Sequence, residues 1–186
     1  MTLPVRIDPF RLRGLALRQL GPQDQAQMMA MQAEALSALP DPAWYFPSEA
    51  WEFAAWLEGR EAFGYFDGEV MAGYAAIAPW RTRGAHAYAR VLGEKPENTY
   101  DFHDVLVRPA YRGRGIHTMF LKLFAEMVRA LDGRAIYATV DPGNSASWHN
   151  FEKMGYVCVR TQPAYDGRMR RYYRLLLPPE VERRER

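Results

Sequence analysis

The chain has 186 residues, of which 48% are hydrophobic and 13% aromatic, and its formal net charge is +2. This length and composition suffice for one buried core, so we expect a single domain over residues 1–186. The small, dispersed charge argues against a nucleic-acid partner. One cysteine excludes an intramolecular disulfide, and no apolar run approaches the roughly 20 residues of a membrane span. We therefore expect a cytoplasmic protein without a membrane partner.

The first third of the chain predicts a strand and two helices. Residues 1–14 form an expected loose leader without a secretory signal. Residues 15–20 alternate apolar and polar side chains, as a strand does. Pro22 suits the first turn of a helix that runs to about residue 39. A second helix follows Ser48, which is a good N-cap residue.

A hairpin and a long loop come next. Residues 62–66 and 70–78 predict two strands around Asp67-Gly68, a dipeptide that favours a tight hairpin turn. Residues 79–98 contain several glycine and proline breaks and predict a loop. Loops of this length are uncommon in a compact domain unless they are functional. We therefore expect this segment to contribute to the site.

The second half of the chain alternates strands and helices, which predicts a mixed α/β class. The clearest helix covers residues 116–131, because its apolar side chains recur with the helical period. The other expected elements are, in order, a strand at 100–107, a strand at 135–140, a helix at 145–154, strands at 156–160 and 169–177 around Asp166-Gly167, and a frayed tail at 178–186.

A Gly/Arg loop, residues 112–115, lies between the strand at 100–107 and the helix at 116–131. Glycines let the backbone approach a ligand, and the N–H groups and dipole of a helix start favour an anion. Arg112 and Arg114 add two cations, so this loop predicts a phosphate site. A dinucleotide fingerprint would need glycine at Thr118, and the Walker sequence Gly-Lys-Ser/Thr is absent.

Two motifs in this region resemble those of one family. Val107-Arg108-Pro109-Ala110-Tyr111-Arg112-Gly113-Arg114-Gly115-Ile116 is similar to the Val-x-Pro and Arg/Gln-x-x-Gly-x-Gly/Ala signature of the GNAT family of acyl-CoA-dependent N-acetyltransferases. Asn144-Ser145-Ala146-Ser147 and Phe151-Glu152-Lys153-Met154-Gly155-Tyr156 resemble its second motif. The match covers about residues 102–159. It implies a GNAT-like domain: a mixed, mostly antiparallel central sheet of six to seven strands, helices on both faces, and a cleft where two parallel strands separate.

The resemblance implies acetyl-CoA (coenzyme A) as the acyl donor and no metal. The pyrophosphate would rest on the backbone N–H groups of residues 112–117, and the pantetheine arm along residues 105–107. A backbone N–H close to Leu106 would stabilise the oxyanion. Asn144 equally suits a helix N-cap. The implied coenzyme A contacts are Val105, Leu106, Val107, Arg112, Gly113, Arg114, Gly115, Ile116, His117, Asn144, Ser147 and Phe151.

Two residues depart from the family pattern. His117 stands where glycine or alanine is usual, so its side chain either points away from the pyrophosphate or binds it. Phe151 stands where many relatives have a tyrosine that protonates the leaving thiolate. A thiol with a pKa of about 8.5 leaves with modest help, and Tyr156, Tyr111 or Tyr165 could supply a proton. Of these, Tyr156 is the candidate acid.

The base and the acceptor pocket are predicted less directly. His103 and Asp104 are the candidate bases, although each also suits a purely structural role. Because successive strand residues face opposite sides, only one of them is expected to reach the cleft. The aromatic run Trp44-Tyr45-Phe46 lies between prolines and predicts an acceptor wall. The cationic residues expected opposite that wall are Arg81, Arg83 and His86.

The sequence thus predicts an N-acetyltransferase that moves an acetyl group to a primary amine by direct attack in a ternary complex. We expect a small-molecule acceptor and a monomeric or homodimeric protein. One alternative, motivated by Phe151 and His117, is a non-catalytic acyl-CoA-binding or interaction module. A second is nucleic-acid binding through the strand carrying Arg168, Arg170, Arg171 and Arg174, although a solvated sheet face explains that strand more simply.

Overall fold

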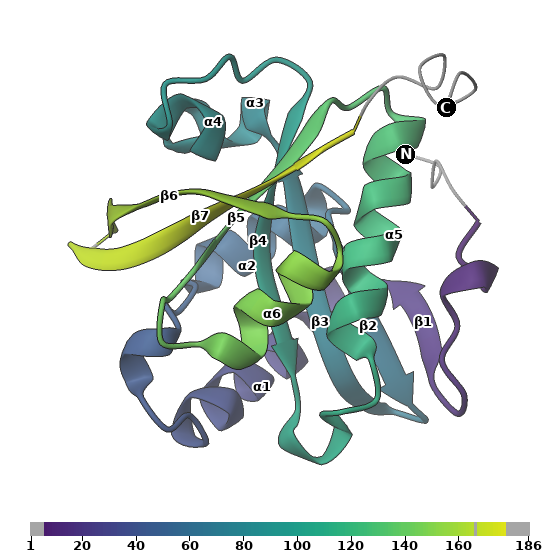
Figure 1. The fold of residues 1–186 in the computed structure, drawn as a ribbon. Coiled ribbons are helices and arrows are strands. Elements are labelled where there is room, and N and C mark those ends of the chain that lie inside the picture. Colours follow the sequence, from purple (N-terminus) through teal and green to yellow (C-terminus); the bar gives the residue numbers. More distant parts are fainter. Residues whose placement is uncertain (1–5, 166, 178–186) are drawn as a thin grey trace.

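The computed structural model describes residues 6–165 and 167–177. A seven-stranded sheet with the order β1-β2-β3-β4-β5-β7-β6 forms its centre (Figure 1). All neighbouring strands are antiparallel except β4 and β5. This arrangement confirms the predicted mixed α/β fold. The strands are β1 (Ala16–Gln19), β2 (Ala62–Asp67), β3 (Val70–Pro79), β4 (Thr99–Val107), β5 (Ala135–Val140), β6 (Val157–Ala164) and β7 (Arg168–Leu176).

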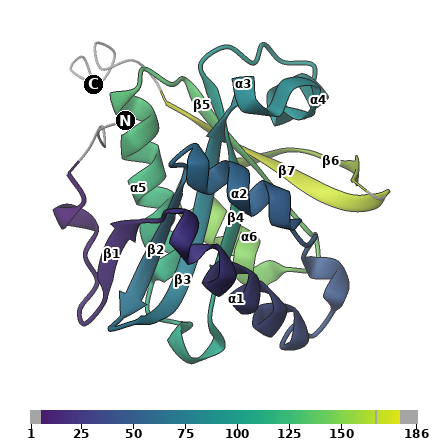
Figure 2. The ribbon, with the colours of Figure 1, turned by 180° about the vertical axis from the view of Figure 1, so that it is seen from behind.

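Helices cover both faces of the sheet. On one face lie α5 (Ile116–Ala130) and α6 (Ser145–Lys153), and on the other lie α1 (Gln25–Ser37) and α2 (Ala50–Glu58) (Figures 1 and 2). The N-cap of α2 is Glu49 rather than the expected Ser48, because the Glu49 backbone N–H donates to the Glu52 carboxylate at 2.9 Å in a capping box.

The segment predicted as a long loop instead contains short helices. These are α3 (Trp80–Arg83), the 3-10 turn η4 (Gly84–His86) and α4 (Tyr88–Val91). The backbone N–H of Tyr88 donates to the buried carboxylate of Asp101 at 3.0 Å, and Tyr88 packs in a small cluster with residues of β5 and β7. That tertiary anchoring, which local composition does not reveal, accounts for the difference.

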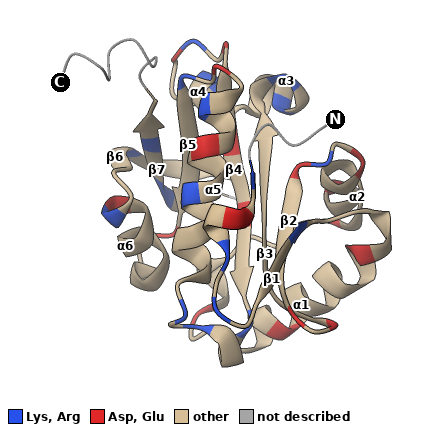
Figure 3. Cartoon of the chain, turned by 90° about the vertical axis from the view of Figure 1, so that its right-hand side faces the viewer, with Lys and Arg blue, Asp and Glu red and all other residues tan. Residues whose placement is uncertain are grey.

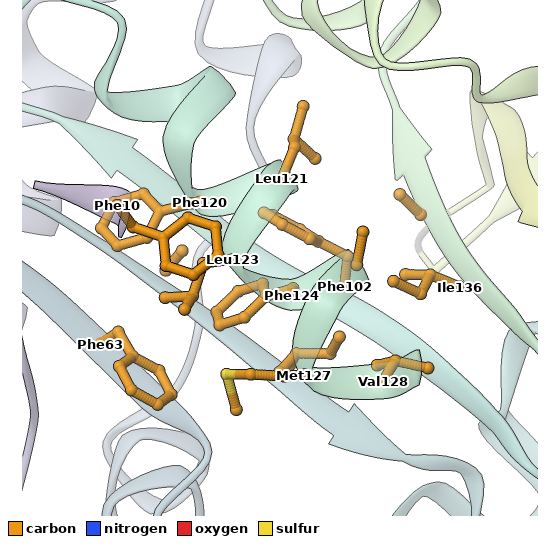
Figure 4. Packing of buried hydrophobic residues seen from close by; sticks show 14 of the residues in the cluster. Phe10, Phe63, Phe102, Phe120, Leu121, Leu123, Phe124, Met127, Val128 and Ile136 are labelled. Atoms are coloured by element: carbon orange, nitrogen blue, oxygen red, sulfur yellow. The ribbon is translucent and has the colours of Figure 1, made fainter. Parts of the chain in front are cut away.

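Two apolar cores fill the space between sheet and helices. Beneath α5, the rings of Phe63, Phe102 and Phe124 meet edge to face at 5.3–5.8 Å (Figure 4). Phe10, in the segment expected as a loose leader, joins this core and is 8% exposed. The opposite core joins α1 and α2 to β3.

The expected tail at 178–186 and the turn residue Asp166 lie outside the described residues.

Two irregularities in β4 shape the cleft. Asp104 pairs with Ala76 of β3, but Phe102 pairs with Ile77, so His103 is an extra residue in a β-bulge. Pairing with β5 ends at Phe102, opposite Ala138, although β5 continues along β7 to Val140. The carboxyl ends of the two parallel strands therefore separate.

Candidate active site

The gap between β4 and β5 continues into a cleft of about 620 Å³. This volume lies in the range of small-molecule sites. The predicted site residues that line it are Trp44, Tyr45, Phe46, His103, Asp104, Val105, Leu106, Val107, Arg112, Gly113, Gly115, Ile116, His117, Asn144, Ser147 and Phe151. The predicted residues that the structure places outside its lining are Arg81, Arg83, His86, Arg114 and Tyr156.

The Gly/Arg loop enters α5 through two glycines in left-handed conformation, Gly113 at φ 76° and Gly115 at φ 81°. A Cβ at either position would meet no atom within 4 Å, so the backbone conformation, and not lack of space, calls for glycine. Gly115 is the N-cap of α5. The N–H groups of the first helical turn have no partner within the helix and are available to an anion.

The two arginines of this loop differ. Arg112 lines the cleft, and its Nε lies 3.4 Å from the Val107 carbonyl oxygen. The guanidinium of Arg114 lies over the ring of Tyr111, 4.9 Å from its centroid, outside the lining. The expected side-chain contact of Arg114 with coenzyme A is therefore not supported by this geometry. Figure 3 shows the basic positions gathered in the loop that enters α5.

Asn144 is the N-cap of α6 and also lines the cleft. Its side-chain oxygen accepts a hydrogen bond from the Ser147 backbone N–H at 3.1 Å. The capping role is confirmed, and it positions the amide on the cleft wall. A contact between this amide and coenzyme A stays a prediction.

His117 turns its ring towards the protein interior. The ring lies 5.2 Å from that of Phe151 and 6.4 Å from that of Phe102. Its Nδ1 is 3.3 Å from Nδ2 of Asn150, which also donates to the Ala146 carbonyl at 2.8 Å. Because an amide nitrogen can only donate, Nδ1 accepts and the proton of the neutral ring lies on Nε2.

Burial lowers the pKa of His117 to about 4. The imidazole is consequently neutral at physiological pH and brings no positive charge to the loop. The ring packs against α6, and His117 also lines the cleft, so whether its side chain binds the pyrophosphate stays a prediction.

Phe151 and Tyr156 belong to the core. Each is 2% exposed, and their rings meet edge to face at 5.1 Å. Among the described residues, the Tyr156 hydroxyl has no hydrogen-bond partner, and burial raises its pKa. Tyr156 does not line the cleft, so we withdraw it as the candidate acid. The chain turn at Gly155 directs Tyr156 beneath α6, which sequence spacing did not indicate.

Asp104 is a buried carboxylate held by two tyrosines. Its Oδ2 lies 2.7 Å from the Tyr45 hydroxyl and 3.0 Å from the Tyr74 hydroxyl. The Tyr45 hydroxyl is also 2.9 Å from the Gln32 side-chain oxygen. Burial raises the pKa of Asp104 to about 6, although the two hydroxyls partly offset this effect. A carboxylate with this pKa can accept a proton near neutral pH.

His103 lies on the same side of the sheet as Asp104. Its ring is 5.5 Å from that of Trp56 in α2 and 6.4 Å from that of Tyr88. Burial, followed by the charge of Arg83, lowers the pKa of His103 well below its ordinary value. Both residues border the cleft, because the β-bulge at His103 breaks the strand alternation, and which of the two side chains meets the acceptor stays a prediction.

Residues 43–46 contact β7 and the end of the β6 hairpin, and residues 44–46 line the cleft. Arg170 of β7 donates to the carbonyls of Ala43 at 3.1 Å and Trp44 at 3.4 Å, and to the Asp141 carboxylate at 3.1 Å. The ring of Phe46 stacks on that of Tyr165 at 4.7 Å. We call this group of contacts the clasp.

Arg170 is only 3% exposed, which contradicts the expectation that the arginines of this strand lie on a solvated face of the sheet. Sequence reasoning missed its role in the clasp, because an arginine in an alternating strand carries no signal of its partners. Other lining residues that were not predicted include Leu39, Pro40, Thr139 and Asp141.

The cations expected opposite the aromatic wall lie elsewhere. The Nε of Arg83 is 3.8 Å from the buried Asp101 carboxylate, and Arg81 lies over the ring of Trp80. His86 is part of η4. None of these three residues lines the cleft, so their predicted role in acceptor binding is not supported.

The described residues contain no helix that is long and apolar enough to cross a membrane. Within the same residues, no group of three or more His, Cys, Asp and Glu side chains is placed to hold a metal ion.

The sequence model of the Acetyltransferase (GNAT) family matches residues 29–156, and the chain belongs to this family. N-alpha-acetyltransferase RimI of Mycobacterium tuberculosis is 30% identical over 112 residues, which are 60% of this chain and 57% of that protein. The L-methionine sulfoximine/L-methionine sulfone acetyltransferase of Salmonella typhimurium is 25% identical over 59% of this chain and 60% of its own length. The matches thus span about three fifths of these relatives.

Solved structures share the fold across nearly the whole chain. The structure of yncA from Salmonella typhimurium, with its cofactor acetyl-CoA, has a TM-score of 0.67 at 18% identity and covers 89% of this chain and 95% of its own. The ribosomal-protein-S18-alanine N-acetyltransferase of Escherichia coli has a TM-score of 0.66 at 16% identity, with coverages of 89% and 97%. At these identities the likeness concerns the fold alone.

Proposed function

We propose that the protein transfers an acetyl group from acetyl-CoA to a primary amine of a small molecule. The observation that carries this proposal is the separation of β4 from β5 beyond Phe102, directly beside the open helix start at Gly115. One element offers backbone groups to an extended arm, and the other offers N–H groups to a pyrophosphate. Family membership supports acetyl-CoA as the donor.

The loop, β4 and α6 would divide the binding of coenzyme A. The N–H groups from Gly113 to His117 would hold the pyrophosphate, with Arg112 as the neighbouring cation. The backbone of residues 105–107 borders the cleft and would hold the pantetheine arm. Asn144 and Ser147 form the wall on the α6 side.

Asp104 is the base that we propose for the reaction. The acceptor reaches the site as an ammonium ion, and a carboxylate with a pKa of about 6 can take its proton. The freed amine then attacks the thioester carbonyl carbon, and a β4 backbone N–H near Leu106 stabilises the oxyanion. His103, neutral and beside Asp104, would line the path of the amine.

Collapse of the tetrahedral intermediate breaks the carbon–sulfur bond and releases coenzyme A as a thiolate. A reference thiol pKa of about 8.5 makes this departure feasible without a strong acid. The thiolate takes its proton from the new amide's nitrogen or from water. Phe151 therefore does not prevent the reaction.

The experiment is a coenzyme A release assay with acetyl-CoA and a panel of primary amines. Saturable release that requires both acetyl-CoA and an amine supports the proposal, and mass spectrometry of the product shows the added acetyl group. The exposed free thiol of Cys158 fits the reducing cytoplasm in which we place this reaction.

A second candidate is a non-catalytic acyl-CoA-binding module. The specific observation that favours it is that position 151 carries a phenylalanine, whose ring has no proton to donate, and that Tyr156 does not line the cleft. Tight coenzyme A binding without turnover of any amine in the panel would support this candidate against the enzyme.

A further inference from the structure

The acceptor half of the cleft combines exposed aromatic surface with an excess of negative charge. Phe46 is 42% exposed and Tyr165 is 47% exposed, and both line the cleft beside Trp44. Side chains of this size normally hide more of their apolar area, so the stacked pair offers a surface for an apolar substituent.

The charges at this end of the cleft are of one sign once ion pairs are counted. Among the described residues that line the cleft, the cations are Arg112 and Arg170, and the acids are Asp104 and Asp141. Arg112 lies in the Gly/Arg loop. The charge of Arg170 is compensated by Asp141 at 3.1 Å, and its guanidinium donates to two backbone carbonyls, while its buried Nε has no hydrogen-bond partner among the described residues.

Asp104, by contrast, has no cationic partner among the described residues. Its hydrogen-bond partners, the hydroxyls of Tyr45 and Tyr74 and the backbone N–H of Val105, are all neutral. His103 adds no charge, because its pKa is lowered. An ammonium group is therefore attracted to this end of the cleft. A carboxylate meets the buried negative charge of Asp104, and Arg170, the arginine among the described residues that lines this end, already has its charge paired with Asp141.

We propose that the acceptor is an apolar, preferably aromatic, primary amine that carries no carboxylate next to the amine. This inference rests on the proposed function and narrows its substrate class. It separates this chain from a relative such as the methionine sulfone acetyltransferase, whose substrate is an amino acid.

The test compares L-phenylalaninol with L-phenylalanine in the coenzyme A release assay at low salt. The two amines share the ring and nearly the same size, and only the second carries a carboxylate. We expect kcat/KM to be at least about tenfold higher for L-phenylalaninol. Equal or higher kcat/KM with L-phenylalanine would overturn the inference.

The variant Asp141→Asn sharpens the test, because the amide can still accept a hydrogen bond from Arg170 but no longer compensates its charge. We expect the preference for L-phenylalaninol to fall by about tenfold. The control is Asp8→Asn, a carboxylate that is half exposed and pairs with Arg6 and Arg11; it should leave the ratio unchanged. A ratio within one preparation does not depend on the folded fraction, so an unchanged ratio in Asp141→Asn would also contradict the inference.

Binding gives a readout that does not need turnover. Calorimetry on the coenzyme A-saturated protein should show tighter binding of L-phenylalaninol than of L-phenylalanine by a similar factor. If this preference holds while no amine is acetylated, the acetyltransferase proposal fails and the charge inference stands. If amines are acetylated without the preference, the inference alone fails.

Discussion

The two halves of the cleft are built in different ways. The half that we propose for the cofactor consists mainly of one continuous segment, residues 105–117, and most of its groups belong to the backbone. The half that we propose for the acceptor is assembled from residues far apart in the chain: Tyr45 and Asp104 are 59 positions apart, and Ala43 and Arg170 are 127. A short local pattern can therefore specify the first half, whereas the second depends on how the whole chain folds.

The two halves also differ in how deeply their key residues are buried. The glycines of the loop are exposed and need only the right backbone conformation. Asp104 and Arg170 are 4% and 3% exposed, and their chemistry depends on neighbours that replace water. Substitutions in the two halves should consequently affect different properties of the protein, namely cofactor affinity in the first half and activity or stability in the second.

Asp104→Asn should have the largest effect. We expect kcat/KM to fall about 10²–10⁴-fold because the variant has no base, while coenzyme A affinity is unchanged. In the wild type, activity should rise with pH through about 6, as the carboxyl ionises. The kcat/KM profile against pH measures this, and an acidic limb that persists unchanged in Asp104→Asn would exclude Asp104 as the base.

The same variant should not lose stability at pH 7. The folded-state pKa of Asp104 is raised, so its contribution to stability is greatest below about pH 4 and is lost as pH rises through about 6. The asparagine avoids this loss and can still accept from a tyrosine. Thermal unfolding against pH would check the sign, and a much lower midpoint at pH 7 would contradict it.

Arg170→Met tests the clasp. Removing one partner of a buried ion pair leaves Asp141 uncompensated, so we expect a loss of about 3–5 kcal/mol in the free energy of unfolding. The matched control is Arg174→Met on the same strand, whose pair with Glu94 is about 30% exposed and should contribute about 1 kcal/mol or less. Denaturant unfolding measures both, and equal losses would show that the clasp adds no special stability.

Gly115→Ala tests the backbone argument for the cofactor half. An alanine in left-handed conformation costs about 1–2 kcal/mol. At Gly68, in the β2–β3 turn, φ is 57° and the space is equally open, so Gly68→Ala should cost a similar amount. Only Gly115→Ala should weaken coenzyme A binding, by about tenfold, which corresponds to about 1.4 kcal/mol. Calorimetric titration with coenzyme A separates the two variants.

His117→Gly should have the smallest effect on the cofactor. The neutral ring packs against Phe151 and Asn150, so coenzyme A affinity should change less than tenfold. Stability should fall by about 1 kcal/mol or more, since glycine is unfavourable in a helix and the ring contacts are lost. A larger loss of affinity in a coenzyme A titration would mean that the imidazole itself binds the cofactor.

Sequence reasoning was most accurate where the structure is local. The positions of most strands along the chain, the hairpin at Asp67-Gly68 and the helix after Gly115 follow from periodicity and turn residues. The prediction of a loop was wrong for residues 79–98, which form short helices anchored by contacts with distant residues, among them the hydrogen bond from the Tyr88 backbone to Asp101. Sequence reasoning was also wrong for Arg170, since an alternating strand predicts which residues share a face but not what covers them.

The chain by itself determined the family, the fold class and the position of the Gly/Arg loop, because these rest on residue types at short, fixed spacings. Only the tertiary structure decided that His103 and Asp104 share one side of the sheet, that the His117 ring packs against α6, and that Arg170 joins residues 43–44 to Asp141. The bulge at His103, the raised pKa of Asp104 and the ion pair between Arg170 and Asp141 all depend on long-range packing. Residues distant in sequence supply the contacts and the burial that produce them.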